Sequence, residues 1–411
     1  MHIMRGRSSI RKFLSILLVL SLAISGCMPV NTDSSGGAKT PAGQSGAAPI
    51  HKSPDANTNG NSMTTYDVWK AEDAEKVSLR KPGEPVRGIY VTSHVARSRR
   101  MDELIALVDQ TELNAMVVDI NSGMALTALP KSPRAASYPI SNTKSAKQMK
   151  QLIAKLKQHR IYTIARIITF KNPELARAVP SWSIKRKDGR VWQDRGGSPW
   201  IDPYRQEAWE YPLKLAEHAA SIGFDEIQFD YVRFPENEKR VDREVAYANP
   251  NKWTKSEAIR KFLHRASVRA HKAGARISAD VFGLVGSSTD DMGIGQSWKS
   301  IASEVDVVSP MIYPSHYADG IWGVAHPDLT PSPIIARALK DITRQNERMN
   351  AQGIDTAKVR PWLQSFTATW VHPHQRYGLQ QVKEQIAASR AAGYPSYLLW
   401  NSANRYPQFD R

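Results

Sequence analysis

The chain has 411 residues, 41% of them hydrophobic and 23% charged, which is the composition of a globular protein rather than a disordered one. A single cysteine, Cys27, excludes a disulfide framework and a zinc module built on several cysteines. The formal net charge is +17, and only one apolar stretch approaches membrane-spanning length, at the N-terminus, which excludes a polytopic membrane protein.

The first 26 residues have the pattern of an export signal. Four basic residues precede an apolar run at 13–24, and two small residues then lead to Cys27. The tetrapeptide at 24–27 resembles a bacterial lipobox, in which the cysteine becomes the lipidated first residue of the mature chain. We therefore predict a lipoprotein signal peptide at 1–26, and an exported protein held in the cell membrane by its lipid, facing the cell envelope or the exterior. An ordinary signal peptide that contains a cysteine is the alternative.

Residues 27–82 are predicted to be the lipidated Cys27 and a flexible linker. The stretch at 28–65 is rich in Ser, Gly, Asn, Thr, Pro and Ala and shows no apolar periodicity. Removal of the four basic signal residues would lower the net charge from +17 to about +13. Such a domain suits anionic lipids or an anionic wall polymer. No basic helix or aromatic RNA-binding motif indicates a nucleic-acid partner.

Residues 83–411 alternate β-branched apolar runs with helical patterns. Eight strands are predicted, at 86–93, 115–122, 162–170, 226–234, 276–283, 306–314, 359–366 and 397–402. Helices are predicted at 101–110, 145–159, 205–221, 255–273, 333–350 and 378–391, with shorter ones at 173–179 and 297–303. Eight such repeats predict an α/β fold, a (β/α)8 TIM barrel. An open doubly wound sheet is the alternative, but no glycine-rich phosphate turn follows the first strand.

Three carboxylates fall at the ends of predicted strands, where barrel enzymes place their active sites. Asp119, Asp230 and Asp280 follow apolar residues of the second, fourth and fifth strands. A charge in such a run is costly without a partner or a purpose. Asp119 alone is equally well explained as a structural residue. Asp230 and Asp280 end neighbouring strands, which predicts two carboxylates over one cleft, the arrangement that glycoside hydrolysis needs.

The sequence also predicts a role for each member of the pair. Arg233 follows Asp230 closely, and a guanidinium nearby would keep that carboxylate ionised as a nucleophile or charge stabiliser. Asp280 lies among apolar neighbours, which tend to raise a carboxyl pKa and suit an acid/base. The exchanged assignment stays open, because side-chain direction near strand ends does not follow from sequence.

Other strand ends carry aromatic and polar side chains suited to binding a sugar. The predicted substrate-binding residues are Asp119, Arg166, Tyr313, His316, Gln364, Trp400 and Asn401. About half of the aromatic residues at these ends are equally well explained as core. A long insertion at 180–202 carries three tryptophans and is expected to be functional. His94 and His316 lack a clear carboxylate partner, so neither a metal nor a cofactor is predicted.

The segment at 223–235, GFDEIQFDYVRFP, is similar to the signature of a bacterial family of glycoside-hydrolase-like proteins. That family was first catalogued as a domain of unknown function and was assigned to the glycosidase-type TIM barrels. Segments at 86–90, 200–204, 278–283 and 309–314 support the resemblance, which covers about 83–405. It implies a barrel fold and glycoside hydrolase activity.

A looser likeness is to chitinase-type barrels, whose fourth strand ends in a D-x-x-D-x-D-x-E pattern. Asp225 and Asp230 match its first and third acids, but Gln228 and Val232 replace the second acid and the catalytic glutamate. Substrate-assisted chitinase chemistry is therefore not expected, and Asp280 is the best candidate for the proton donor.

The sequence favours a surface-anchored, monomeric glycoside hydrolase that acts on a cell-wall or extracellular polysaccharide. A non-catalytic carbohydrate-binding lipoprotein on a barrel scaffold is the main alternative, because fold alone does not establish catalysis. A metal-assisted hydrolase such as a polysaccharide deacetylase is a third possibility, but no compact H-x3-H motif is present.

Overall fold

The computed structural model describes residues 85–121 and 144–408. The predicted signal peptide, Cys27 and the predicted linker lie outside these residues. In the two described ranges, no helix combines the length and the apolar character needed to cross a membrane.

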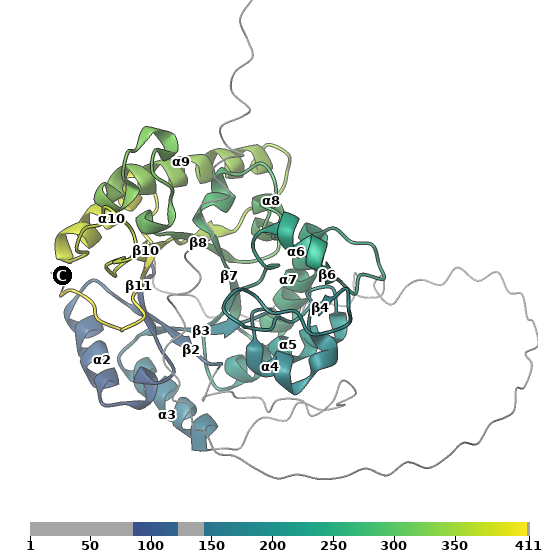
Figure 1. The fold of residues 1–411 in the computed structure, drawn as a ribbon. Coiled ribbons are helices and arrows are strands. Elements are labelled where there is room, and N and C mark those ends of the chain that lie inside the picture. Colours follow the sequence, from purple (N-terminus) through teal and green to yellow (C-terminus); the bar gives the residue numbers. More distant parts are fainter. Residues whose placement is uncertain (1–84, 122–143, 409–411) are drawn as a thin grey trace, which may run out of the picture. The chain divides into compact units, whose positions relative to one another are not determined.

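Eight parallel strands close into a barrel, shown end-on in Figure 1. They are β1 (Arg87–Val91), β2 (Ala115–Asp119), β3 (Tyr162–Ile168), β5 (Glu226–Asp230), β7 (Arg276–Phe282), β8 (Val307–Ile312), β10 (Trp362–Gln364) and β11 (Tyr397–Trp400). Neighbours pair in chain order, and the pairing of β10 with both β8 and β11 closes the ring. Every predicted strand is present, so the predicted barrel is confirmed.

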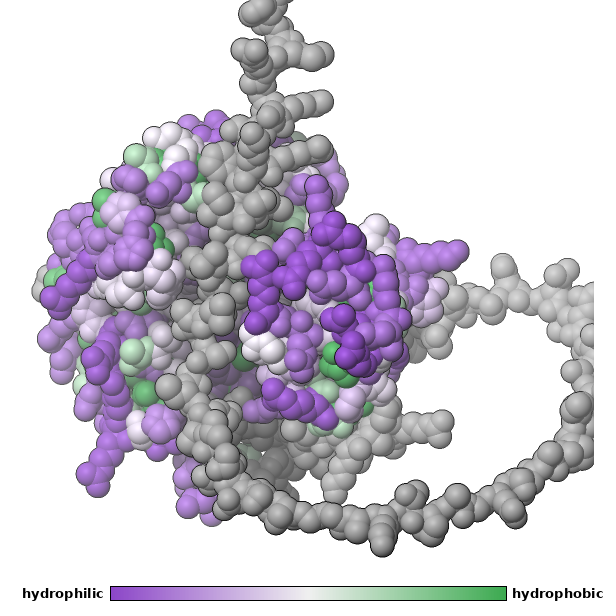
Figure 2. Space-filling view, viewed as in Figure 1, coloured by the Kyte–Doolittle hydropathy of each residue, from purple (hydrophilic) through white to green (hydrophobic). Residues whose placement is uncertain are grey.

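Helices surround the barrel, and one follows each of the first seven strands. They are α2 (Arg100–Gln110), α3 (Lys144–Gln158), α4 (Pro173–Ala178), α5 (Gln206–Ser221), α6 (Glu238–Glu244), α7 (Lys255–Lys272), α8 (Trp298–Ala302), α9 (Pro331–Asn350) and α10 (Leu379–Ala391). All but α6 were predicted. The α6 sequence buries only Val241, so it lacks the apolar stripe that marks a helix. Figure 2 shows hydrophilic side chains gathered over α6 and the neighbouring two-stranded antiparallel sheet of β4 (Lys185–Arg186) and β6 (Val245–Ala246).

Helix α7 illustrates how local sequence sets these boundaries. It begins with a capping box, in which Glu257 N donates to Thr254 Oγ1 at 3.1 Å and Thr254 N donates to Glu257 Oε2 at 2.7 Å. Its buried residues recur at helical spacing along one face. Gly274 ends it with a φ of +79°, a conformation that favours glycine, and the chain turns directly into β7.

The seventh strand of the barrel is broken, although a continuous strand was predicted at 359–366. A short piece, β9 (Lys358–Val359), pairs with β8, and β10 begins three residues later. Pro361 lies in the gap and has no N–H to donate to a neighbouring strand. The backbone N–H of Arg360 still donates to Val308 O at 3.0 Å, so the strand continues in direction.

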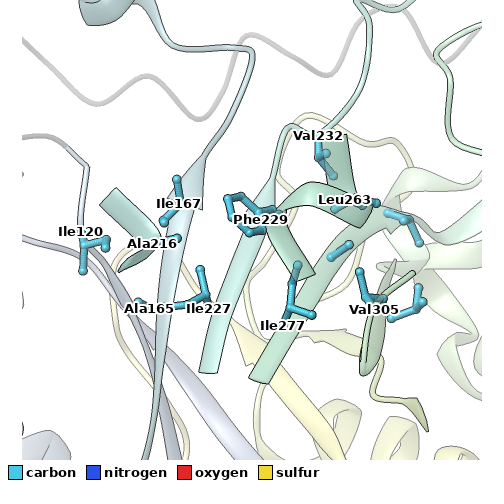
Figure 3. Packing of buried hydrophobic residues seen from close by; sticks show 14 of the residues in the cluster. Ile120, Ala165, Ile167, Ala216, Ile227, Phe229, Val232, Leu263, Ile277 and Val305 are labelled. Atoms are coloured by element: carbon cyan, nitrogen blue, oxygen red, sulfur yellow. The ribbon is translucent and has the colours of Figure 1, made fainter. Parts of the chain in front are cut away.

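Strand alternation divides the apolar residues into two separate cores. The larger core lies between the strands and the helices, and Figure 3 shows its Ile167, Ile227, Phe229 and Ile277 from three neighbouring strands. A smaller core fills the barrel interior and includes Tyr90, Val117, Ile164, Trp362 and Leu398. Residues that alternate with the outward set therefore point into the barrel, which fixes where the acidic residues of β5 point.

The barrel interior also holds a buried ion pair, which the sequence did not predict. Arg360 donates to both carboxylate oxygens of Glu226, through Nη2 and through Nη1 at 3.2 Å. Tyr162 OH donates to Glu226 Oε2 at 3.1 Å, and Ser278 Oγ donates to Oε1 at 2.5 Å. Glu226 begins β5 and Asp230 ends it, so this cluster lies at the opposite end of the strand from the candidate catalytic pair.

Candidate active site

A chain of charged groups holds Asp230 at the carboxyl end of the barrel. Arg166, on β3, donates through Nε to Asp230 Oδ2 at 3.1 Å, and its Nη2 donates to the same oxygen. Its Nη1 donates to Asp119 Oδ2 at 2.9 Å, and Tyr90 OH donates to that oxygen at 3.1 Å. Arg166 is buried between the two acids. The structure thus unites two predicted substrate-binding residues, Asp119 and Arg166, with the predicted catalytic Asp230.

The backbone after Asp230 supplies a second donor. Tyr231 has a φ of +50°, which is uncommon for a residue other than glycine and ends β5 abruptly. Its N–H donates to Asp230 Oδ1 at 2.6 Å. Strained backbone of this kind is concentrated at functional sites. Both oxygens of Asp230 therefore accept hydrogen bonds from fixed donors.

The guanidinium beside Asp230 belongs to Arg166, and the expectation that Arg233 would supply it was wrong. Arg233 donates instead to Glu236 Oε1 at 2.6 Å and to Phe234 O at 3.0 Å. The physical reason is the turn at Tyr231, because strand alternation no longer sets side-chain direction beyond Asp230.

Asp280 lies next to Asp230 but in a different environment. The strand register pairs Phe229 with Ala279, so the two aspartates occupy the following position on neighbouring strands. Asp280 is only 2% exposed, and Trp362 Nε1 donates to its Oδ1 at 2.7 Å. Burial, followed by the negative charge of Asp230, raises the pKa of Asp280 well above the usual carboxyl range. One carboxyl is thus paired with a cation and the other favours its neutral form.

A buried amide fixes the backbone of β7 around Asp280. Gln296 Nε2 donates to the carbonyl oxygen of Asp280 at 3.1 Å, and its Oε1 accepts the N–H of Phe282 at 3.0 Å. Both bonds come from one fully buried side chain, which holds this strand end in a single conformation.

Aromatic rings form one wall beside the acids. Trp400, at the end of β11, stacks on Tyr90 with centroids 4.0 Å apart and packs edge-on against Trp362 at 5.5 Å. The guanidinium carbon of Arg166 lies 5.2 Å from the Trp400 ring centroid. The predicted binding residue Trp400 is therefore in direct contact with the group that positions Asp230.

A second aromatic group lies at the end of β8. Tyr313 is 5% exposed, and its ring contacts His316 at 5.2 Å and Phe366 at 5.7 Å. Burial, then the charges of Asp280 and Asp230, raises the pKa of Tyr313 well above its usual value. Burial lowers the pKa of His316 to about 4, so its ring is neutral near pH 7. Both predicted residues lie at the carboxyl end of the barrel, with Tyr313 electrostatically coupled to the acids.

Two other predicted binding residues hold loops in place. Gln364 is fully buried, its Oε1 accepts Ser315 N at 3.0 Å, and its Nε2 donates to Asp328 Oδ1 at 3.1 Å. Asn401 Nδ2 donates to two backbone carbonyls and its Oδ1 accepts Ala403 N at 2.9 Å. These amides support loops through hydrogen bonds within the protein, and their contact with a sugar stays a prediction.

The tryptophans of the insertion at 180–202 are also buried rather than displayed. Trp182, Trp192 and Trp200 are each less than 5% exposed. Trp200 packs edge-on against Tyr231 with centroids 6.1 Å apart, and its Nε1 donates to Asp194 Oδ2 at 3.0 Å. The insertion therefore braces the turn after Asp230 through apolar packing.

Sequence reasoning missed Tyr90 and Trp362 as site residues. Trp362 lies two positions before Gln364 on the same strand, so alternation alone would have placed it inside the barrel. No group of three or more His, Cys, Asp or Glu side chains suited to a metal ion occurs within 85–121 and 144–408.

Residues 88–406 match the sequence profile of a family described as "putative glycosyl hydrolase domain". The chain belongs to this family. The predicted family resemblance and the predicted enzyme class, glycoside hydrolase, are confirmed at that level. No curated protein sequence matches the chain significantly.

Three solved structures are similar to this chain at low sequence identity. An endo-β-1,4-mannanase from Thermotoga petrophila is 13% identical with a TM-score of 0.50, over 79% of this chain and 68% of that one. The PgaB (BpsB) glycoside hydrolase domain from Bordetella bronchiseptica is 14% identical with a TM-score of 0.49, over 77% and 94%. A hypothetical protein from Ruminiclostridium thermocellum ATCC 27405 is 28% identical with a TM-score of 0.38, over 50% and 98%. At such identity the likeness to the mannanase shows the fold alone.

Proposed function

We propose that this protein hydrolyses glycosidic bonds of a cell-wall or extracellular polysaccharide while anchored to the membrane through Cys27, with Asp230 and Asp280 as its catalytic pair. The observation that carries the proposal is the contrast between two carboxyls at adjacent positions of neighbouring strands. Asp230 contacts a buried guanidinium, whereas Asp280 is buried with a raised pKa. A carboxyl paired with a cation, next to a carboxyl whose pKa is raised by burial, is the usual combination of nucleophile and acid in such sites.

Asp280 is the proton donor in this mechanism. The indole N–H of Trp362 can only donate, so Asp280 Oδ1 must accept and the acidic proton resides on Oδ2. From Oδ2 the proton passes to the glycosidic oxygen as the bond between that oxygen and the anomeric carbon breaks. Asp280 is then a carboxylate, which can later take a proton from an attacking water.

Asp230 stabilises the positive charge that develops at the anomeric carbon of the sugar. Its Oδ2 accepts two bonds from Arg166, while its Oδ1 accepts one, from Tyr231 N. Oδ1 therefore keeps the freer lone pair, with which it bonds to the anomeric carbon or stabilises the cation beside it. Water finally delivers its hydroxyl to the anomeric carbon, releasing Asp230 and returning a proton to Asp280.

The decisive experiment is a screen of the full chain against wall and exopolysaccharide preparations, with released reducing ends as the readout. Asp230→Asn should abolish release. The matched control is Asp202→Asn, because Asp202 is also a buried aspartate, with a pKa raised to about 6 by burial. Release by wild type and by the Asp202 variant, but not by the Asp230 variant, supports the proposal. Equal release by all three proteins contradicts it.

A further inference from the structure

One aromatic side chain near the site remains exposed to solvent. Trp370 lies in the loop between β10 and α10 and is 38% exposed. In the described part of the chain, the other exposed large hydrophobic residues are Val268, Leu329 and Leu379, all aliphatic. A partly exposed indole offers a flat apolar face that a ligand can contact.

Trp370 is connected to Tyr313, at the carboxyl end of the barrel, by successive ring contacts. It stacks on Phe366 with centroids 6.0 Å apart and an interplanar angle of 17°. Phe366 in turn meets the Tyr313 ring at 5.7 Å. Exposure rises along this series, from buried Tyr313 through half-buried Phe366 to exposed Trp370. The rings therefore form a continuous path from the barrel interior to the surface.

Hydrogen bonds hold the turn that carries Trp370 and the segment that follows it. Val371 N donates to Ala368 O at 3.0 Å, which closes a turn around Trp370. Asp328, from the segment between β8 and α9, accepts the Gln375 N–H at 3.0 Å through Oδ2. The carbonyl oxygen of Asp328 accepts Tyr377 OH at 2.9 Å. The indole is thus presented from a fixed backbone, which lowers the entropic cost of binding a ligand.

We infer that Trp370 is the stacking platform of an outer sugar subsite, which binds a pyranose unit of the polysaccharide beyond the units at the cleavage point. This inference rests on the proposed function, because the path begins at Tyr313, which follows β8, the neighbour of the strand that carries Asp280. A flat indole suits the apolar C–H face of a pyranose ring. Two ring contacts separate Trp370 from Tyr313, so its occupant is a further unit of the chain and not the unit being cleaved. The enzyme would therefore favour polymers over short substrates.

Binding, rather than hydrolysis, provides the test. The full chain in mild detergent is run by affinity electrophoresis through gels containing galactomannan, glycol chitin or soluble peptidoglycan strands. We expect at least one polymer to retard wild type, Trp370→Ala to weaken that retardation about tenfold, and Trp370→Phe to restore part of it. The control is Val268→Ala, because Val268 is 42% exposed on α7 and should not affect retardation.

The outcomes separate this inference from the proposed function. Retardation that depends on Trp370 in a protein that releases no reducing ends would preserve the subsite and contradict the hydrolase. Reducing-end release with equal retardation of wild type and Trp370→Ala would overturn the subsite alone. Failure of all three polymers to retard wild type would also overturn it. So would a change in oligomeric state in Trp370→Ala without a change in retardation, because the indole would then serve a protein interface.

Discussion

The indole N–H of Trp362 donates to Asp280 Oδ1 at 2.7 Å, joining two side chains that are 1% and 2% exposed. The two residues lie 82 positions apart in the chain and come from β10 and β7. The bond stabilises the ionised carboxylate and so lowers the pKa of Asp280, against the larger opposing effect of burial. Trp362 thus positions the proposed acid and makes it a stronger acid than burial alone would allow.

Replacing Trp362 with Phe should therefore raise the pKa of Asp280 further. An acid is active while protonated, so activity falls as pH rises through its pKa, and this basic limb should move to higher pH in Trp362→Phe. We also expect a roughly tenfold loss of kcat, or about 1.4 kcal/mol, because the carboxyl is no longer held in one orientation. The measurement is a pH profile of kcat and of kcat/KM.

Trp298→Phe is the matched control for that experiment. Trp298 is also buried, and its Nε1 donates to Asn346 Oδ1 at 2.7 Å, well outside the set of groups that contact Asp280. The Trp298→Phe variant should be less stable than wild type, but the basic limb of its pH profile should not move. If both variants give the wild-type profile, Trp362 has only a packing role.

The two carboxyls should respond differently to the leaving group. On an activated aryl glycoside of the true sugar, Asp230→Ala should lose turnover altogether. Asp280→Ala should keep partial turnover with a good leaving group, which needs little protonation, and lose about 100-fold or more with a poor one. The measurement is kcat/KM across a series of leaving-group pKa values. The reverse pattern would exchange the two roles, and near-wild-type rates in both variants would exclude the paired mechanism.

Sequence periodicity predicted the barrel because each strand and helix buries its own apolar face. The same alternation placed Asp230 and Asp280 at neighbouring strand ends, since adjacent parallel strands end at the same edge. The barrel fold and the adjacency of Asp230 and Asp280 could both be predicted, because each depends only on local periodicity and on the regular order of the strands.

The partners of those acids could not be predicted, because they come from strands that are distant in the sequence. Arg166 reaches Asp230 from β3, and Trp362 reaches Asp280 from β10. The turn at Tyr231 could not be predicted either. Tyrosine rarely adopts a positive φ, so this backbone conformation is imposed by the surrounding structure and leaves no pattern in the sequence. Gln364 was predicted to bind a sugar because amides hydrogen-bond to hydroxyl groups. In the structure its amide forms hydrogen bonds with Ser315 and Asp328 of the neighbouring loops.

Membrane retention should depend on the thiol of Cys27, which lies outside the described residues and remains a sequence-based prediction. Cys27→Ala removes the proposed acyl acceptor, so the exported protein should appear in the soluble fraction. The fold should be intact, because β1 begins at Arg87, far along the chain. The measurement is the distribution between membrane and soluble fractions, with Cys27→Ser as a second variant that also lacks a thiol. Full membrane retention of both variants would contradict the lipid anchor.

The free energy of unfolding should depend strongly on Arg166, because this buried guanidinium compensates two acids, Asp119 and Asp230. Arg166→Met leaves both carboxylates without their cation, and breaking a buried ion pair from one side costs about 3–5 kcal/mol. Asp119→Asn should cost less, since the pair of Arg166 with Asp230 remains. The control is Arg190→Met, whose partner Asp188 lies at the surface, and which should leave the unfolding midpoint almost unchanged. Urea denaturation of wild type and the three variants measures their free energies of unfolding, which we expect to be lowest for Arg166→Met, then Asp119→Asn, then Arg190→Met. If Arg166→Met and Arg190→Met unfold at the same midpoint, the buried charge chain does not hold the candidate site together.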